Sequence, residues 1–492
     1  MFQSYPSRSR KAFVATCLVV IGVMISVGVA GASATTKSLS TNYTLVNLGS
    51  AQANVTVSYY KEDGSSWSAS ASSTSITLAA NGGQAIIAQY LDSTMTSGRG
   101  SAVVSSDQPL GAVVQILARS PQVPTQGAYT GSSVSDSTYY VPLVIRNLNG
   151  TNSQIMIQNA DTGSVTVQVQ LIKSSASPGA NYTKSGISIA QGATFYYDLN
   201  DESSANVADG WFGSAIVTAS ASKKITVVSN LFAGADQLQT FPGFPSTSPG
   251  TTWFVPLFTS RLTNALSTPV TVQNLSGGTI AVGGITMSCV PDASSTGSTP
   301  FNASNTASVA NNESTFFNPV IDTSLPNNWF GSCQITAPGN VVAFVQMRQP
   351  GVTASADAYA AIKGGATNTK AIIPLAAKRL ANGFATVITI QNLSGSQATV
   401  NLTYVPSPNY IAGGGSSSNI PVNGLTIPAN GSLIRNLRLT SGAVAETALP
   451  DGWFGTLTIQ STGAPIDAFV QLTTIGATAG DTLMAHGVFT QP

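Results

Sequence analysis

The feature that most constrains this chain is an internal repeat with a period of about 115 residues. Clear copies begin as "IQNADTGSVTVQVQL" at Ile157, "VQNLSGGTIAVGGITMSC" at Val272 and "IQNLSGSQATVNLTY" at Ile390, and a divergent copy begins as "LVNLGSAQANVTVSYY" at Leu45. Their shared asparagines lie 112, 115 and 118 residues apart, at Asn47, Asn159, Asn274 and Asn392. A solenoid repeat spans only ~20–50 residues, whereas this period suits an independently folded β-sandwich.

Every copy carries its sequence features in the same order. A proline segment comes first in three copies, as Val141-Pro142-Leu143, Val255-Pro256-Leu257 and Ile373-Pro374-Leu375. The asparagine segment follows, and then a stretch such as "VTVQVQL" from Val165, in which apolar and polar residues alternate as in a half-buried strand. A hairpin signal, a tryptophan motif and a closing apolar stretch complete the copy.

These features predict six to eight strands per copy and an all-β chain of four tandem antiparallel β-sandwiches of the Ig-like class. We name the copies units 1 to 4 and expect them to span 35–135, 136–248, 249–366 and 367–492, after a signal peptide at 1–34. The 46 glycines and the low charged fraction of 8% also favour strands and turns over helices.

The charge balance excludes two classes of partner. The sequence contains 20 basic and 19 acidic residues. Because the two numbers nearly balance, we expect no basic surface for nucleic acid and no acidic surface for a cationic partner. After the N-terminus no apolar run approaches the ~20 residues that span a bilayer. We therefore expect no nucleic-acid partner and no membrane insertion beyond the N-terminal segment.

The N-terminus has the features of an export signal. Arg8, Arg10 and Lys11 precede an apolar run from Ala12 to about Ala30, and Ala32-Ser33-Ala34 offers a small-x-small cleavage site. We expect cleavage after Ala34 and an extracytoplasmic protein, either secreted or held at the cell surface. An uncleaved N-terminal anchor is the alternative, because the apolar run is long for a signal.

Removal of the signal leaves two cysteines, Cys289 and Cys333, in an oxidising compartment, where a lone pair forms a disulfide by default. In the repeat alignment Cys289 takes the place of Tyr404 at the end of one strand. Cys333 takes the place of Ala215, just after the tryptophan motif. We predict an intradomain disulfide across two strands of unit 3; free or metal-binding thiols are the alternative.

The tryptophan motif pairs two aromatic residues once in each of units 2 to 4, at Trp211 and Phe212, Trp329 and Phe330, and Trp453 and Phe454. Its fixed place directly before a core strand favours a central plug of each sandwich core, since a tryptophan buries ~150–250 Å². An aromatic platform for a ligand is the alternative. Unit 1 has Gly98-Arg99-Gly100 at this place instead.

The prolines Pro142, Pro256 and Pro374 allow two interpretations. Four units have three junctions, and proline, which cannot donate to a ladder, suits a linker or edge position between units. Alternatively, unit 1 lacks the edge strand that this segment provides elsewhere. An open groove would then accept a strand from another copy by β-augmentation.

The sequence contains no convincing candidate for an active site. A catalytic triad would need the single histidine, His486, which lies near the end of the chain. The acidic residues Asp198, Asp201, Glu202 and Asp209 occur in unit 2 only, which favours a solvated loop over weak calcium binding or paired catalytic carboxylates. We expect no enzyme activity, no metal and no cofactor.

The order of "VPL", "VQN", a Gly-Ser/Thr turn, "LPDGWFG" and an "AFVQ"-type strand resembles tandem β-sandwich (Ig-like) repeats of bacterial cell-surface proteins. The resemblance covers essentially the whole chain after the signal, through Pro142, Asn159, Trp211 and Phe212 and their counterparts. It implies an extracytoplasmic β-sandwich array and provides no catalytic residue. Unit 1 departs from it at Arg99.

Repetition, low charge and strands rich in Thr, Ser and Gly favour a structural protein of the cell envelope or extracellular matrix, of the surface-layer, sheath or filament type. Its partners would be further copies of itself or other envelope proteins. An adhesin or carbohydrate-binding surface protein with a glycan ligand is the alternative. A secreted hydrolase is disfavoured, because the sequence offers no candidate catalytic site.

Overall fold

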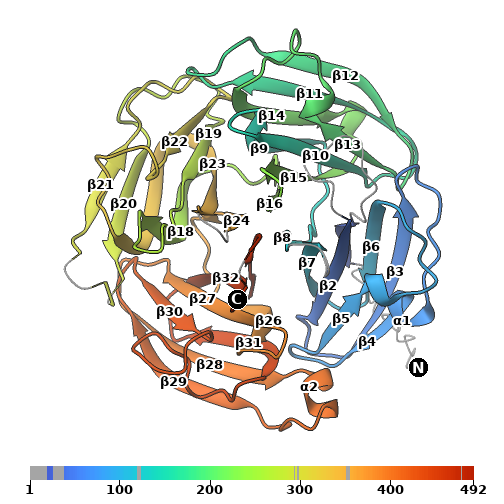
Figure 1. Cartoon of the computed structure of the whole chain (residues 1–492), viewed down its shortest axis with the longest axis vertical. Helices are drawn as coiled ribbons and strands as arrows, with labels where there is room; N and C mark the ends of the chain where they lie inside the picture. The colour runs from blue at the N-terminus through green and yellow to red at the C-terminus, as the bar shows by residue number, and fades with distance from the viewer. Residues whose placement is uncertain are drawn as a thin grey trace, which may run out of the picture.

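The computed structural model describes residues 19–25, 38–118, 124–292, 294–295, 298–350, 355–477 and 479–491. The described chain is all-β and forms seven antiparallel sheets, consistent with β-sandwiches, as the alternating sequence predicts. Figure 1 shows these sheets arranged as a ring around a central axis, with unit 4 lying beside unit 1. An open row of modules would keep unit 4 away from unit 1, so this closure is a property that the repeat did not predict.

The strands follow the four units in order. Unit 1 contains β2 (Leu39–Asn47), β3 (Ala53–Lys61), β4 (Ser75–Leu78), β5 (Gln84–Ala88), β6 (Gly100–Ser106), β7 (Leu110–Ala118) and β8 (Gln126–Thr130), and β1 (Val19–Ile25) precedes it. Unit 2 contains β9 (Thr138–Arg146), β10 (Thr151–Asn159), β11 (Val165–Lys173), β12 (Tyr182–Ile189), β13 (Thr194–Asp198), β14 (Trp211–Ala219), β15 (Ile225–Ala233), β16 (Gln237–Pro242) and β17 (Phe244–Pro245).

Units 3 and 4 repeat this series. Unit 3 contains β18 (Gly250–Ser260), β19 (Val270–Asn274), β20 (Thr286–Pro291), β21 (Phe301–Ser304), β22 (Ser314–Phe317), β23 (Trp329–Gln349), β24 (Ser355–Ala360) and β25 (Ile362–Lys363). Unit 4 contains β26 (Lys370–Ala377), β27 (Phe384–Asn392), β28 (Ala398–Pro406), β29 (Ile420–Ile427), β30 (Ser432–Asn436), β31 (Phe454–Ser461), β32 (Ile466–Thr474), β33 (Leu483–Gly487) and β34 (Phe489–Gln491). The helices are short: α1 (Ala71–Thr74), α2 (Pro408–Ala412), η1 (Gln89–Leu91), η2 (Leu199–Asp201) and η3 (Ser220–Ser222).

Units 1, 2 and 4 each contribute strands to two sheets. The axial sheet ends in a strand at the axis, and its orders are β5-β2-β7-β8, β13-β10-β15-β16 and β30-β27-β32-β33 in units 1, 2 and 4. The flanking sheet has the orders β1-β6-β3-β4, β17-β9-β14-β11-β12 and β34-β26-β31-β28-β29. In unit 3 the 21-residue strand β23 belongs to both layers and joins them into one eight-stranded sheet.

Alternation along the strands builds the core between the two layers. In β11 the side chains of Val165, Val167, Val169 and Leu171 are buried, and the residues between them are exposed or partly exposed. This period of two places one apolar face of the flanking sheet against the axial sheet. The sequence prediction of half-buried strands is confirmed here.

The repeated asparagine fixes a turn in every unit. Asn274 is fully buried; its Nδ2 donates to the carbonyls of Gly278 (2.7 Å) and Val309 (2.8 Å), and its Oδ1 accepts from the amide of Ser276 (2.9 Å). The side chain thus satisfies backbone groups of its own turn and of the loop before β22. The same three kinds of contact recur at Asn47, Asn159 and Asn392.

The three proline segments lie inside strands of the flanking sheets. Pro142, Pro256 and Pro374 belong to β9, β18 and β26, and in each strand the pairing register shifts beside the proline. A bulge tolerates proline, because the missing N–H then breaks no ladder bond. The segments also face neighbouring units, since the carbonyl oxygen of Pro142 accepts a hydrogen bond from the hydroxyl of Ser314 in unit 3 (2.7 Å). They are therefore strands that also lie at the contacts between units.

Candidate functional site: the contacts between units and the central axis

The tryptophans of the motif lie inside the cores of their units. Trp211, Trp329 and Trp453 are each at most 1% exposed. The indole Nε1 of Trp211 donates to the carbonyl of Ala180 (3.0 Å), and that of Trp329 to the carbonyl of Thr299 (3.0 Å). No face of these rings is available to a ligand, so the burial agrees with a core plug and speaks against an aromatic platform.

Unit 1 fills the same core position from another part of its sequence. Trp67, in the segment between β3 and β4, is 3% exposed. A Cβ placed on Gly98 would lie 3.5 Å from its six-membered ring. Trp67 therefore packs beside Gly98, and the missing tryptophan at this position does not mean a missing core aromatic.

The glycine that ends the motif is required by close approach of two strands. A Cβ on Gly213 would lie 2.0 Å from the carbonyl oxygen of Ile172 on β11. The equivalent distances are 1.9 Å at Gly100, 2.2 Å at Gly331 and 2.0 Å at Gly455. Since no real Cβ contact is that short, this position excludes every side chain, and unit 1 keeps the glycine although it lacks the two aromatics.

The hydroxyl residue after this glycine bonds the next unit. Ser101 in unit 1 donates to the carbonyl of Gly192 in unit 2 (3.1 Å). The same bond joins Ser214 to Asn312 (2.5 Å), Ser332 to Asn430 (3.0 Å) and Thr456 to Gly82 (3.3 Å). The last pair runs from unit 4 back to unit 1, so one contact repeated four times closes the ring.

In unit 2 the second aromatic of the motif also lies against the neighbouring unit, whereas in unit 4 Phe454 meets Tyr410 of its own unit edge to face. Phe212 meets Phe316 of unit 3 edge to face, with ring centroids 5.8 Å apart. In unit 1 Arg99 occupies this place, and its guanidinium carbon lies 4.2 Å from the ring centroid of Tyr196 in unit 2. Arg99 also pairs with Glu62, with 2.6 Å between Nη2 and Oε1. A cation–π contact thus replaces an aromatic pair at the corresponding interface.

Further contacts join unit 4 to unit 1. Gln84 Nε2 donates to the carbonyl of Pro374, and Gln491 Nε2 donates to the carbonyl of Leu48 (2.6 Å). Phe489 packs so close to Gly111 that a Cβ there would lie 2.5 Å from its ring. The last strand of unit 4, β34, therefore packs against unit 1.

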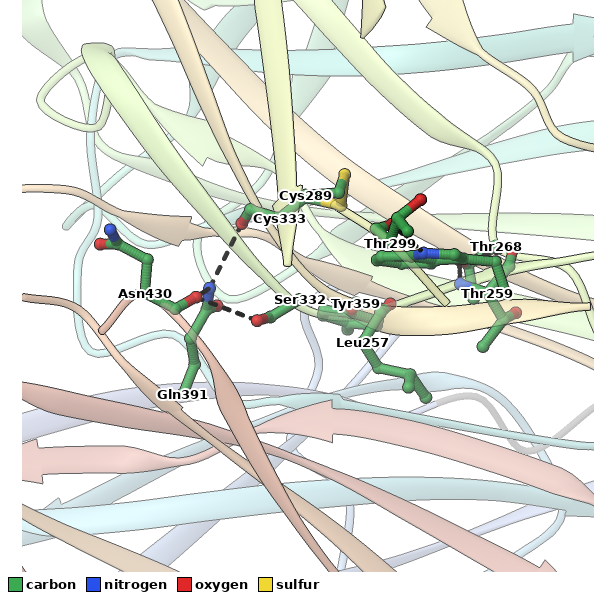
Figure 2. Close-up of a disulfide and its surroundings, with 11 residues drawn as sticks. Leu257, Thr259, Thr268, Cys289, Thr299, Ser332, Cys333, Tyr359, Gln391 and Asn430 are labelled. Carbon is green, nitrogen blue, oxygen red and sulfur yellow. Dashed lines mark hydrogen bonds between the residues drawn. A yellow bond between two sulfur atoms is a disulfide. The ribbon is translucent and has the colours of Figure 1, made fainter. Parts of the chain in front are cut away.

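Cys289 and Cys333 form the predicted disulfide, with Cα atoms 4.1 Å apart. They are directly opposed on β20 and β23, as the repeat alignment indicates. Figure 2 shows Gln391 and Asn430 of unit 4 beside this strand, where Gln391 Nε2 donates to the carbonyl of Cys333 (3.3 Å). The disulfide closes a loop across 44 positions, which stabilises by about 4 kcal/mol in the chain-entropy model.

Four edge strands meet at the axis, and a carboxylate satisfies their inward N–H groups. Asp357 on β24 is fully buried. Its two oxygens accept from one backbone N–H of each unit, at Ala128 (3.0 Å), Thr240 (3.0 Å), Ala358 (2.8 Å) and Ala485 (2.5 Å). Such groups on a free edge would otherwise be orphaned or would pair with another chain.

A second aspartate makes the same kind of contact with backbone amides that lie two residues earlier in three of these strands. Asp481 is fully buried and accepts from the amides of Leu238, Ala356 and Leu483, each at 3.1 Å. Burial raises the pKa of both aspartates well above the usual range, against the N–H bonds that favour the charged form. The proximity of Asp357 raises the pKa of Asp481 further.

His486 lies at the axis on β33, well away from solvent. It is 1% exposed, its Nδ1 lies 2.7 Å from the carbonyl of Gly487, and its Nε2 has no partner among the described residues. Burial lowers the pKa of His486 to about 4, because a charged imidazolium there would be unsolvated. A histidine sealed in this way cannot reach a substrate at the surface.

The acidic cluster of unit 2 is divided between exposed and buried positions: Asp201 and Asp209 are exposed, as a solvated loop predicts, whereas Asp198 and Glu202 are buried. Glu202 is 6% exposed and pairs with Lys184 at 2.6 Å. Asp209 pairs with Arg146, whose Nε and Nη2 also donate to the carbonyls of Leu199 and Glu202. The expectation of a solvated loop is wrong for Glu202, because basic side chains from β9 and β12 fold over it.

No protein-family model matches the chain, and no curated protein matches it. No group of His, Cys, Asp and Glu suited to a metal ion occurs within the described ranges. In the same part of the chain, no helix has the length and apolarity to cross a membrane.

Sequence reasoning missed the residues that hold the ring together. The hydroxyl after the motif glycine had a signal, since Ser or Thr follows that glycine in all four units. A second signal is an amide at one place in every closing strand, at Gln115, Asn230, Gln346 and Gln471, all buried near the axis. Asp357 and Asp481 had none, because each occurs in one unit only.

Proposed function

We propose that this chain is an exported, non-enzymatic structural protein of the cell envelope or extracellular matrix, built of four Ig-like β-sandwich modules. The observation that carries the proposal is the hydroxyl-to-carbonyl contact repeated at Ser101, Ser214, Ser332 and Thr456. It gives the repeated motif a role in holding units together. A motif kept for ligand binding would instead present its aromatics to solvent.

The buried chemistry supports the non-enzymatic part of the proposal. The single histidine is enclosed at the axis, and Asp357 and Asp481 are fully committed to backbone N–H groups. These groups stabilise the ring and have no route to a substrate. Ring closure also uses the head-to-tail surfaces within one molecule, so assembly into a layer or sheath would use the faces and periphery of the ring.

Electron microscopy of the purified protein tests this function. We expect ring-shaped particles that associate into sheets, sheaths or filaments as concentration rises, with little effect of salt because the surface carries few charges. Particles that stay monodisperse across salt and concentration would contradict the structural role.

An adhesin remains the second candidate, and one surface feature favours it. A cavity of about 370 Å³ in unit 1 is lined by Lys61, Glu62, Asp63, Trp67, Ser97, Gly98 and Arg99. Charged groups beside an aromatic edge can bind a polar ligand such as a sugar. A glycan array probed with the native protein and with Arg99→Ala tests this alternative, and specific binding that Arg99→Ala abolishes would support it.

A further inference from the structure

Unit 1 has a strand in its flanking sheet that comes from outside the repeat. In units 2 to 4 the central strands β14, β23 and β31 are flanked on one side by the proline-segment strands β9, β18 and β26. Unit 1 has no proline segment, yet its equivalent strand β6 is also flanked on that side. The strand there is β1, which pairs with β6 from Val19 opposite Ser106 to Ile25 opposite Gly100.

This place in the sandwich requires a continuous apolar strand. In β9 the residues from Val141 to Ile145 are all buried and apolar, and in β18 so are those from Trp253 to Phe258. Both faces of such a strand are covered, one by the unit's own core and the other by a neighbouring unit. A strand buried on two faces reads as an unbroken apolar run rather than an alternating one.

The N-terminal segment fits this requirement. Residues Val19–Ile25 read VVIGVMI, with no charged or strongly polar side chain. Without them, β6 would present a free edge of backbone N–H and C=O groups over seven residues. The apolar run that resembles an export signal therefore also has the composition of the missing strand.

We propose that the β6 edge of unit 1 is a binding slot for an apolar β-strand, and that its occupant is this chain's own segment Val19–Ile25. The segment is then neither removed as a signal nor placed in a bilayer. It stays in the folded protein as a strand. This inference concerns the first unit alone: it replaces cleavage after Ala34 by retention of the segment, and the proposed envelope role then rests on the contacts between units.

Cross-linking of the full chain tests the slot and its register. In a Cys17→Ser background, Gly22→Cys is combined with Val103→Cys, the directly opposed position on β6. The matched control combines Gly22→Cys with Ser105→Cys, which faces Val20 and lies diagonally about 7–8 Å away across the pair. We expect mild oxidation to link the first pair within one molecule at least tenfold more than the second.

A second pair of variants tests whether β1 protects β6. The double variant Gly22→Pro with Val23→Pro removes one backbone N–H that donates toward β6. Two neighbouring residues are replaced because successive N–H groups of a strand point to opposite sides, so one of the two must point toward β6. Gly22→Ala with Val23→Ala keeps both donors and is the control. We expect the proline variant to speed amide hydrogen exchange in β6 at least tenfold and the alanine variant to leave it unchanged.

The outcomes separate the possible occupants. Equal cross-linking of both cysteine pairs, or unchanged exchange in the proline variant, would show that the segment does not sit in the slot. A disulfide that joins two molecules would make a second copy the occupant and would overturn the proposal as stated. Assembly in the microscope is a separate readout, so this proposal and the structural function can fail independently.

Discussion

The four positions of the tryptophan motif make contacts in two different places. The tryptophan lies in the unit's own core, and the glycine allows the paired neighbouring strand, β11 in unit 2, to approach closely. The hydroxyl residue lies against the neighbouring unit, and in unit 2 the second aromatic does so as well. A motif of four residues thus fixes both the interior of a unit and its attachment to the next.

The buried histidine makes the stability of the fold sensitive to acid. The pKa of His486 is about 4 in the folded protein and about 6.5 in an unfolded chain. Because the unfolded chain binds the proton more tightly, the stability contributed by this site is complete above pH 6.5 and is lost as the pH falls toward 4. Between pH 7 and pH 4.5 this loss amounts to about 2 kcal/mol of unfolding free energy.

Chemical denaturation at the two pH values checks this, with His486→Gln as the comparison. The glutamine variant lacks the titrating group, so its unfolding free energy should fall less than that of the native protein over the same interval. Equal falls in both proteins would mean that His486 does not titrate differently on folding.

At the scale of strands, the motif glycine sets how closely two neighbours pair. In Gly213→Ala the new Cβ would overlap the backbone of β11 at 2.0 Å, and backbone cannot move aside as a flexible side chain can. We expect a loss of about 3 kcal/mol or more in unfolding free energy. Gly395→Ala is the matched control, because a Cβ there meets nothing within 4 Å.

Thermal unfolding followed by circular dichroism measures both glycine variants. The control should melt close to the native protein, whereas Gly213→Ala should melt clearly lower. If the two variants melted alike, close strand approach would not be the reason for this glycine.

The peripheral and axial strand edges are protected in different ways. On the periphery, β12 and β29 carry bulges at Gly186 and Gly424, both with positive φ, which disturb an edge that could otherwise recruit another strand. At the axis, β8, β16, β24 and β33 present N–H groups to Asp357 and Asp481. The β6 edge is the one covered by the N-terminal segment.

For the whole molecule, one carboxylate connects all four units. Replacing it in Asp357→Ala would leave the amides of Ala128, Thr240 and Ala485 without an acceptor at a buried axis. Since each unsatisfied buried group costs about 1–3 kcal/mol, we expect a loss of at least about 3 kcal/mol. The ring should also open, because the four edge strands lose their common partner.

Urea denaturation and small-angle X-ray scattering measure the two effects. Asp63→Ala is the control, since among the described residues Asp63 bonds only to Ser65, in its own exposed turn. The control should keep the native radius of gyration, and Asp357→Ala should show a larger one. A variant as stable and as compact as the native protein would rule out the axial role of this carboxylate.

The sequence alone determined the all-β class, the repeat, the strand alternation and the opposed cysteines. Each of these depends on local pattern: a period of two specifies a half-buried strand, and a shared alignment places Cys289 opposite Cys333. The motif tryptophan, buried in all three of its copies, follows from the same reasoning about a small core.

Only the tertiary structure decided that the four units close into a ring, that Trp67 replaces the missing motif tryptophan, and that two aspartates bind the axial strands. The physical reason is that these contacts join residues far apart in the chain, such as Thr456 and Gly82, and depend on the angle between successive units. Hydrophobic periodicity specifies which face of a strand is buried. It does not specify which distant edge that strand meets.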